Sequence, residues 1–386
     1  MSQLYTKEVL RAYLAHYHHL STANPLSHED IPEYVAKVGC IQYDPLDVVG
    51  RNSDLVLQAR CAQYQKGDIE PFLYNQQVLF DVWDKNMAIA CVADWPYFTH
   101  YRQYYLSWCE EHEEAVKHIT QYLMEHEYAC SSDFELEERV GWHYGPQRLA
   151  KAALECMCYA GLAVVHHKKH TRRYYALAQR MIPKDILRSD APYHTDTEYF
   201  RIFTLRRIKS IGALWNRPSD AWLGTQGYKT PNRQDAFQYL LEENFITPIQ
   251  VEDVRHALYV PTESLLDLNA VQGSPKEDCV KFIAPLDNLL WDRRLVYELF
   301  GFAYRWEVYT PISQRKYGYY VLPMFLNGNF IGRIEMKTDK KTSTLIVQNI
   351  WMEDAFPYQQ YQERIWAGLE RFMHYNRCTA LLDCTP

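Results

Sequence analysis

The sequence lacks the short motifs that mark many metal and nucleotide sites. Its ten cysteines form no Cys-x-x-Cys pair, and only Cys156 and Cys158 lie close together, so neither a zinc site nor a disulfide framework is predicted. No His-Glu-x-x-His and no glycine-rich phosphate loop occurs, which argues against zinc-protease chemistry and against an ATP-driven mechanism. We therefore expect no metal ion and no other cofactor.

Long apolar runs and an excess of positive charge are also missing. No apolar run reaches the length of about 20 residues that a membrane-spanning helix needs. The first five residues have neither the basic start nor the apolar centre of a signal peptide, and the scattered cysteines favour reduced thiols, so a cytoplasmic protein is expected. The formal net charge of −7 argues against a uniformly basic nucleic-acid-binding surface. Any DNA contact is expected from a local patch.

Aromatic and apolar residues are plentiful. The chain has 386 residues, of which 47% are hydrophobic, and it includes 31 tyrosines and 10 tryptophans. This composition leaves ample material for a core, and the length predicts two to four modules of about 100 residues each.

The first module, residues 1–112, has the pattern of helices followed by a hairpin. Apolar residues at helical spacing predict a helix over residues 6–20 with Thr6 as its N-cap, a second over 31–38 that ends at Gly39, and a third over 53–65. Residues 78–91 then predict a hairpin that turns at residues 84–86. Helices followed by a hairpin are typical of a winged helix.

The same pattern recurs twice. In residues 113–190, helices are predicted over 115–126 and 147–159, and a hairpin over 162–177 carries a basic tip. In residues 191–272, helices over 199–208 and 233–243 precede a hairpin over 246–260. Three tandem winged-helix modules are therefore predicted.

The last module, residues 273–386, has a different composition. Residues 272–275 predict a boundary, and alternating strands from residue 317 to 352 turn at 327–329 and 338–342. A closing helix over 357–375 has an apolar stripe. The overall prediction is an α+β fold of tandem winged-helix modules followed by a C-terminal β-barrel-like domain with a terminal helix.

The segment of residues 39–51 combines an amide and a carboxylate. Gln42 and Asp44 are two positions apart, so in an extended chain their side chains share one face and Tyr43 points to the other. Pro45 holds Asp44 in an extended or turn geometry. One interpretation is a pair presented for chemistry. The other is that Asp44 caps a turn and Gln42 bonds to the backbone, as in most Asp-Pro turns.

The order Gln-aromatic-Asp-Pro, followed by Asp47-Val48-Val49 and Arg51, resembles the start of the YcaQ-like family. Its members are winged-helix DNA glycosylases that unhook interstrand crosslinks. The resemblance continues over residues 80–86, 285–294, 300–302 and 315–323, so it spans nearly the whole chain.

This resemblance implies a glycosylase that hydrolyses the N-glycosidic bond of cationic N7-alkylguanine, including crosslinked guanine. Gln42 and Asp44 would then be the catalytic pair. The family also has a branch with an amide in place of the carboxylate, and Asp44 puts this chain in the carboxylate branch. Asp44 would stabilise the oxocarbenium ion and take a proton from water, which Gln42 would orient.

The expected partner is double-stranded DNA with alkylated purines or crosslinks, bound by a monomer that does not associate with membrane. Basic residues in the wings and in the matching blocks are the expected DNA-contacting residues. They are Arg51, Lys85, Lys168, Lys169, Arg172, Arg173, Arg293 and Arg294.

Two other interpretations remain open at this point. A winged-helix regulator that binds DNA without catalysis would have the same modules, but it needs no carboxylate close to DNA, where that charge would repel phosphate. A tRNA- or protein-binding scaffold rests on analogy of fold alone.

Overall fold

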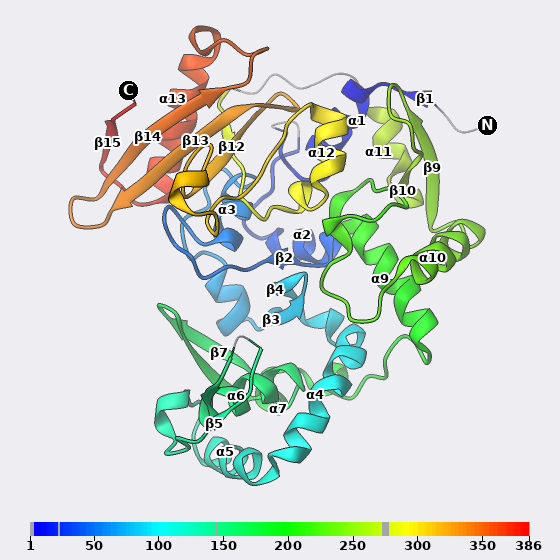
Figure 1. The fold of residues 1–386 in the computed structure, drawn as a ribbon, viewed down its shortest axis with the longest axis vertical. Helices are drawn as coiled ribbons and strands as arrows, with labels where there is room; N and C mark the ends of the chain where they lie inside the picture. The colour runs from blue at the N-terminus through cyan, green and yellow to red at the C-terminus, as the bar shows by residue number, and fades with distance from the viewer. Residues whose placement is uncertain (1–3, 22–23, 144, 272–277, 386) are drawn as a thin grey trace. The chain divides into compact units, whose positions relative to one another are not determined.

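The computed structural model describes residues 4–21, 24–143, 145–271 and 278–385, in a mixed α+β fold (Figure 1). The chain forms two compact units, one made of Met1–Asp68 with Phe200–Pro386 and the other of Ile69–Tyr199. The two ends of the chain thus share one unit. This division does not coincide with the predicted module boundaries at residues 112, 190 and 272, and the tandem winged-helix arrangement remains a prediction.

The first unit begins with three helices, and the sequence predicted the N-cap of the first and the C-terminal end of the second. Helix α1 (Lys7–Tyr17) starts at Thr6, whose side chain accepts a hydrogen bond of 3.2 Å from the backbone N–H of Val9. Helix α2 (Ile31–Val38) ends at Gly39, whose φ of 76° favours glycine. Helix α3 (Asn52–Gln58) is shorter than the predicted 53–65.

A three-stranded sheet in this unit combines the third predicted hairpin with the start of the chain. Strands β9 (Ile246–Val251) and β10 (Leu258–Pro261) are antiparallel, and β1 (Leu4–Tyr5) pairs in parallel with β9. The helices nearby in sequence are α9 (Asp196–Ile211), α10 (Thr230–Glu242) and α11 (Leu265–Ala270).

The C-terminal part of this unit is a five-stranded sheet, drawn from yellow to red in Figure 1. Its order is β11 (Lys281–Phe282), β12 (Val321–Leu326), β13 (Asn329–Asp339), β14 (Thr344–Met352) and β15 (Ala380–Asp383). Neighbours are antiparallel except β14 and β15. In the part of the chain that the structure describes, the sheet is open, so it is half a barrel rather than a closed one.

Two helices accompany this sheet. Helix α13 (Tyr358–Tyr375) buries Ile365, Leu369 and Phe372, in agreement with the predicted stripe. Helix α12 (Arg293–Phe300) was not predicted. The predicted boundary at residues 272–275 lies outside the described residues.

The second unit contains the other two predicted hairpins. These are β3 (Leu79–Asp84) with β4 (Asn86–Cys91), and β7 (Ala163–Lys169) with β8 (Arg172–Leu177). Helices α4 (Thr99–Glu111), α5 (Glu113–Glu125) and α6 (Leu149–Tyr159) enclose a core that includes Ile119, Leu154 and Met157. The shorter elements are β5 (Arg139–Val140), β6 (Gln147–Arg148), α7 (Ala178–Met181) and α8 (Lys184–Leu187).

Candidate active site

The segment with Gln42 and Asp44 follows helix α2 directly. The positive φ of Gly39 ends the helix, and strand β2 (Ile41–Gln42) begins two residues later. Tyr43 is buried, as expected for the side chain that points away from the pair, and Asp44 is half-buried. Gln42 is only 5% exposed, so it is less open than a residue presented on a rim.

Two buried asparagines hold the backbone of this segment. The side-chain amide of Asn52 donates a hydrogen bond of 2.7 Å to the carbonyl oxygen of Gln42. The amide of Asn288 donates one of 3.0 Å to the carbonyl of Cys40. Asn52 also accepts a bond of 3.0 Å from the N–H of Leu286. The 285–292 block therefore contacts the Gln42–Asp44 segment through backbone and asparagine groups.

A buried ion pair stabilises the loop that contains Asn288. Arg60 donates two hydrogen bonds to Asp287, of 2.8 and 2.9 Å, and both side chains are fully buried. Burial by itself would lower the pKa of Arg60, but the adjacent Asp287 carboxylate outweighs it and holds that pKa above its ordinary value. Asp287 lies beside Asn288, so this pair fixes the loop that supplies one of the two asparagines.

The Asp44 carboxylate is partly committed to a turn. Its Oδ1 accepts a hydrogen bond of 2.9 Å from the N–H of Leu46 across Pro45. Burial raises the pKa of Asp44, and the hydrogen bond from Leu46 partly opposes that rise. Within the part of the chain that the structure describes, this is the one hydrogen bond of the side chain. The turn-capping interpretation is thus correct for Oδ1, while Oδ2 keeps its acceptor capacity.

The side-chain amide of Gln42 makes no hydrogen bond to any residue that the structure describes. The alternative in which this amide bonds to the backbone is therefore not observed in the described structure. The residue is 5% exposed, and its amide atoms keep some contact with solvent, because they are not among the fully buried polar atoms that lack a partner. Its donor and acceptor groups suit a bound water molecule.

Tyr320 is a neighbour of Asp44 that the sequence alone did not single out. Burial raises the pKa of Tyr320 well above its ordinary value, and the nearby Tyr304 and Asp44 add to that rise. Its hydroxyl donates a 3.5 Å hydrogen bond to the carbonyl of Gly50. A neutral hydroxyl therefore stands close to the carboxylate, and both belong to blocks of the sequence that carry the family resemblance.

The basic tip of the β7–β8 hairpin divides into two faces. Lys168 forms an ion pair with Asp81 of strand β3, and Arg173 donates a 2.6 Å hydrogen bond to the sulfur of Met87. Lys169 and Arg172, which pair across the hairpin, are both exposed. Successive side chains along a strand point to opposite faces, so the sequence already indicates that Lys168 and Lys169 lie on different faces.

The remaining predicted DNA-contacting residues differ in exposure. Arg51 is half-buried at the N-cap of α3, and Lys85 is 5% exposed in the turn of the β3–β4 hairpin. Arg293 and Arg294 lie in the first turn of α12, where Arg294 is exposed and Arg293 half-buried. Exposure therefore favours Arg294, Lys169 and Arg172 over Lys85 as phosphate contacts.

The described residues contain no group of three or more His, Cys, Asp or Glu side chains placed to hold a metal ion. All ten cysteines are free thiols. No helix in the described ranges is long and apolar enough to cross a membrane.

Comparison with known proteins agrees with the resemblance seen in the sequence. A family model described as DNA glycosylase AlkZ-like matches residues 35–374. The solved structure of Streptomyces sahachiroi DNA glycosylase AlkZ is similar over 100% of both chains, with a TM-score of 0.65 and 12% sequence identity. At that identity the structural likeness shows the fold alone. The family match spans most of the chain, includes Gln42, Asp44, Asn52 and Asn288, and shows that this protein belongs to the AlkZ-like family of DNA glycosylases.

Proposed function

We propose that this glycosylase hydrolyses the N-glycosidic bond of cationic N7-alkylguanine in DNA, including guanines joined in interstrand crosslinks, with Asp44 and Gln42 as its catalytic residues. The observation that carries the proposal is the half-buried Asp44, which has one oxygen uncommitted to other described residues, on a segment whose carbonyls are fixed by Asn52 and Asn288. Preorganised charge of this kind stabilises a developing cation more than mobile solvent does.

The chemistry needs one carboxylate because the leaving base is already cationic. When the bond between the sugar C1′ and the purine N9 breaks, its electron pair neutralises the base, so no general acid is required. Glycosidases with neutral leaving groups need a second carboxyl group as the acid. The single Asp44 therefore fits a cationic lesion better than an undamaged or deaminated base.

The second half of the reaction adds water to C1′. The Asp44 carboxylate stabilises the oxocarbenium ion and accepts one proton from the attacking water, while the oxygen of that water bonds to C1′. The unpaired amide of Gln42 orients the water, with both a donor and an acceptor available. Burial raises the pKa of Asp44, which makes it a stronger base than an ordinary exposed aspartate.

The range of substrate sizes is inferred from the exposure of Asp44. A crosslinked base is tethered to the other strand and does not swing far out of the duplex, so the enzyme must reach its sugar from outside. Asp44 is half-buried and not sealed in the core, which suits such an approach. The protein is proposed to act as a monomer on DNA in the cytoplasm.

The experiment offers three duplexes to the enzyme in single-turnover assays. One carries N7-methylguanine, one a nitrogen-mustard-type guanine crosslink, and one hypoxanthine as a neutral deaminated base. We expect abasic sites from the first two at comparable rates and little release of hypoxanthine. Release of N7-methylguanine with complete failure on the crosslink would indicate a closed pocket and contradict the unhooking activity. A protein that binds all three duplexes and cleaves none would be a DNA-binding regulator instead.

A further inference from the structure

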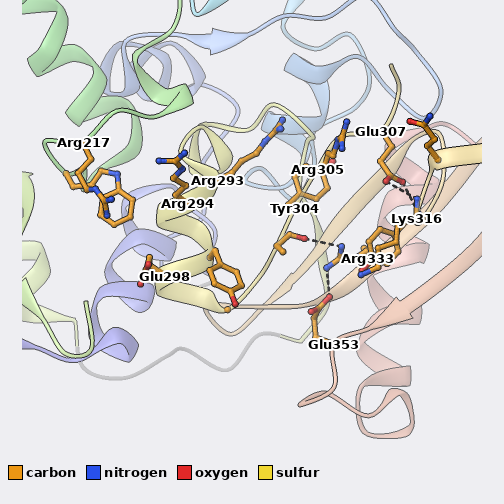
Figure 2. Close-up of a pocket in the computed structure, with 16 residues that line it drawn as sticks. Arg217, Arg293, Arg294, Glu298, Tyr304, Arg305, Glu307, Lys316, Arg333 and Glu353 are labelled. Atoms are coloured by element: carbon orange, nitrogen blue, oxygen red, sulfur yellow. Dashed lines mark hydrogen bonds and ion pairs between the residues drawn. The ribbon is translucent and has the colours of Figure 1, made fainter. Parts of the chain in front are cut away.

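A cavity of about 770 Å³ lies in the first unit, at the side of helix α12. Its lining comes from segments that are far apart in the sequence, namely Trp215 and Arg217, the exposed side of α12, residues 303–305 with Glu307, Gln314 with Lys316 and Tyr317, and Arg333 with Glu353. Figure 2 shows these side chains converging from several elements. Neither Asp44 nor Gln42 lines this cavity.

Positive charge dominates the lining. Six cationic side chains face three glutamates, in a protein whose net charge is −7. Two of the glutamates are occupied internally, since Glu353 pairs with Arg333 at 2.5 Å and Glu307 accepts backbone hydrogen bonds of 3.0 and 2.9 Å from Lys316 and Tyr317. The lining therefore has three more cationic than anionic side chains, although the Glu307 carboxylate lies close enough to Arg305 to interact with it.

Four arginines remain available for a ligand. Among the described residues, none of them forms an ion pair: they are Arg217, Arg293, Arg294 and Arg305. In the view of Figure 2 they follow one another along one side of the cavity, while Glu298 and Glu353 lie on the other. A row of guanidinium groups matches the repeated charge of a phosphodiester chain better than one isolated phosphate.

An aromatic side chain completes the site. Tyr297 lies one turn after Arg293 on α12, lines the cavity, and is 59% exposed. An exposed ring beside arginines is the combination with which proteins bind single-stranded nucleic acid, because every base has a face that stacks. A volume between about 300 and 1,000 Å³ holds a drug-sized ligand. One or two nucleotides fit this size, and a duplex does not.

We infer that this cavity binds one or two nucleotides of a single DNA strand, with their phosphates on Arg293, Arg294 and Arg305 and a base stacked on Tyr297. Neither residue of the proposed catalytic pair lines the site, and its occupancy would add an unpaired strand to the ligands of this glycosylase. The inference concerns binding alone, so it does not depend on whether Asp44 and Gln42 perform the chemistry.

The test measures binding of a fluorescent, undamaged ten-nucleotide oligothymidylate. The triple variant Arg293→Gln, Arg294→Gln, Arg305→Gln should bind at least about tenfold more weakly, and its slope of log affinity against log salt should fall by about 0.7 for each phosphate that these side chains no longer neutralise. The variant Tyr297→Ala should bind about tenfold more weakly, and Tyr297→Phe should bind like the wild type, since stacking needs the ring alone.

A matched variant distinguishes a loss of binding at the cavity from a general effect of the reduced positive charge. Arg255→Gln, Lys341→Gln, Arg377→Gln removes the same charge from exposed positions outside the cavity. Equal losses in both triple variants would overturn the inference, as would full binding by Tyr297→Ala. Binding of a glutamate-rich peptide as tightly as the oligonucleotide would show that the cavity takes an acidic peptide instead. Thermal unfolding of each variant confirms that a loss of binding reflects a folded protein.

Discussion

We propose different roles for the two carboxylate oxygens of Asp44. Oδ1 closes the turn with the N–H of Leu46 at 2.9 Å, and we propose that Oδ2 faces the sugar. Asp44 is therefore able to cap the Asp-Pro turn and also to serve as the proposed catalytic carboxylate. Gln42 differs from Asp44, because its side-chain amide makes no hydrogen bond to the described residues and its atoms are not fully buried.

His18 shows how strongly burial alters a single residue in this fold. Burial and the nearby Arg60 lower the pKa of His18 from 6.5 to about 3, so the ring is neutral and its Nε2 lies 2.9 Å from the carbonyl of Ile211. In the unfolded chain His18 binds a proton as the pH falls below about 6.5, whereas in the folded protein it stays neutral until the pH is near 3. Stability is therefore fully present above pH 6.5 and is lost progressively as the pH falls toward 3.

The lowered pKa of His18 predicts that the free energy of unfolding depends measurably on pH. Between pH 6.5 and 5, urea unfolding should show a free energy that falls by up to about 1.4 kcal/mol per pH unit from His18. The variant His18→Gln keeps a donor and an acceptor but does not titrate, so its slope should be shallower by about that amount. The pKa of His19 is also lowered, to about 4. His19 therefore contributes a pH dependence of the unfolding free energy in both the wild type and the variant. Identical slopes would contradict the assignment of a neutral buried His18.

At the scale of elements, the β7–β8 hairpin combines structural and exposed cations. Lys168 and Arg173 are engaged with Asp81 and Met87 of the β3–β4 hairpin. Burial alone would lower the pKa of Arg173, but nearby Tyr175, Tyr159 and Asp81 hold it above its ordinary value. Lys169 and Arg172 lie on the opposite face, in solvent.

The two faces predict different phenotypes. Lys169→Gln with Arg172→Gln should weaken binding of any duplex and lower the salt slope by about 0.9 for each phosphate that is no longer neutralised, with an unchanged unfolding midpoint. Lys168→Gln with Arg173→Gln removes the same charge but should lower the unfolding midpoint, because Asp81 loses its partner. A titration in which the first variant keeps the wild-type salt slope would show that this hairpin does not touch DNA.

Local sequence patterns predicted most helices and hairpins. They did not predict contacts between residues far apart in the sequence. Helix α2 ends at Gly39 and the β3–β4 hairpin turns at Lys85 as expected, because adjacent residues determine both. Helix α4 was missed because it buries little more than Tyr105 and Cys109, which leaves no clear apolar stripe. The division of the basic wing follows from strand alternation, which the sequence does carry.

The supporting residues of the site were missed for a related reason. Asn288 and Cys40 are 248 positions apart, and Asn52 and Leu286 are 234 apart. A single sequence does not reveal which distant segments meet, so the matching blocks were recognised without their shared role. The structure shows that Asn52 and Asn288 fix the backbone on both sides of Gln42.

At the scale of the whole molecule, the buried pair of Arg60 and Asp287 joins segments from the two ends of the chain. Removing one partner of such a pair leaves an uncompensated charge in the core. We therefore expect Asp287→Asn to lower the free energy of unfolding by about 3–5 kcal/mol, measured by urea denaturation. The exposed Asp190→Asn serves as the control and should change it by less than about 0.5 kcal/mol. A decrease in Asp287→Asn no larger than in the control would mean that the pair does not stabilise the fold.

We propose that the charge of Asp44 drives base release, and a comparison of the wild type with Asp44→Asn tests this. Single-turnover release of N7-methylguanine should fall by about 10² to 10³ at saturating enzyme, because asparagine keeps the shape and the hydrogen bond to Leu46 but not the charge. Gln42→Ala should lose less, since the charge remains. Release by a folded, DNA-bound Asp44→Asn protein at the wild-type rate would show that the Asp44 charge does not drive base release.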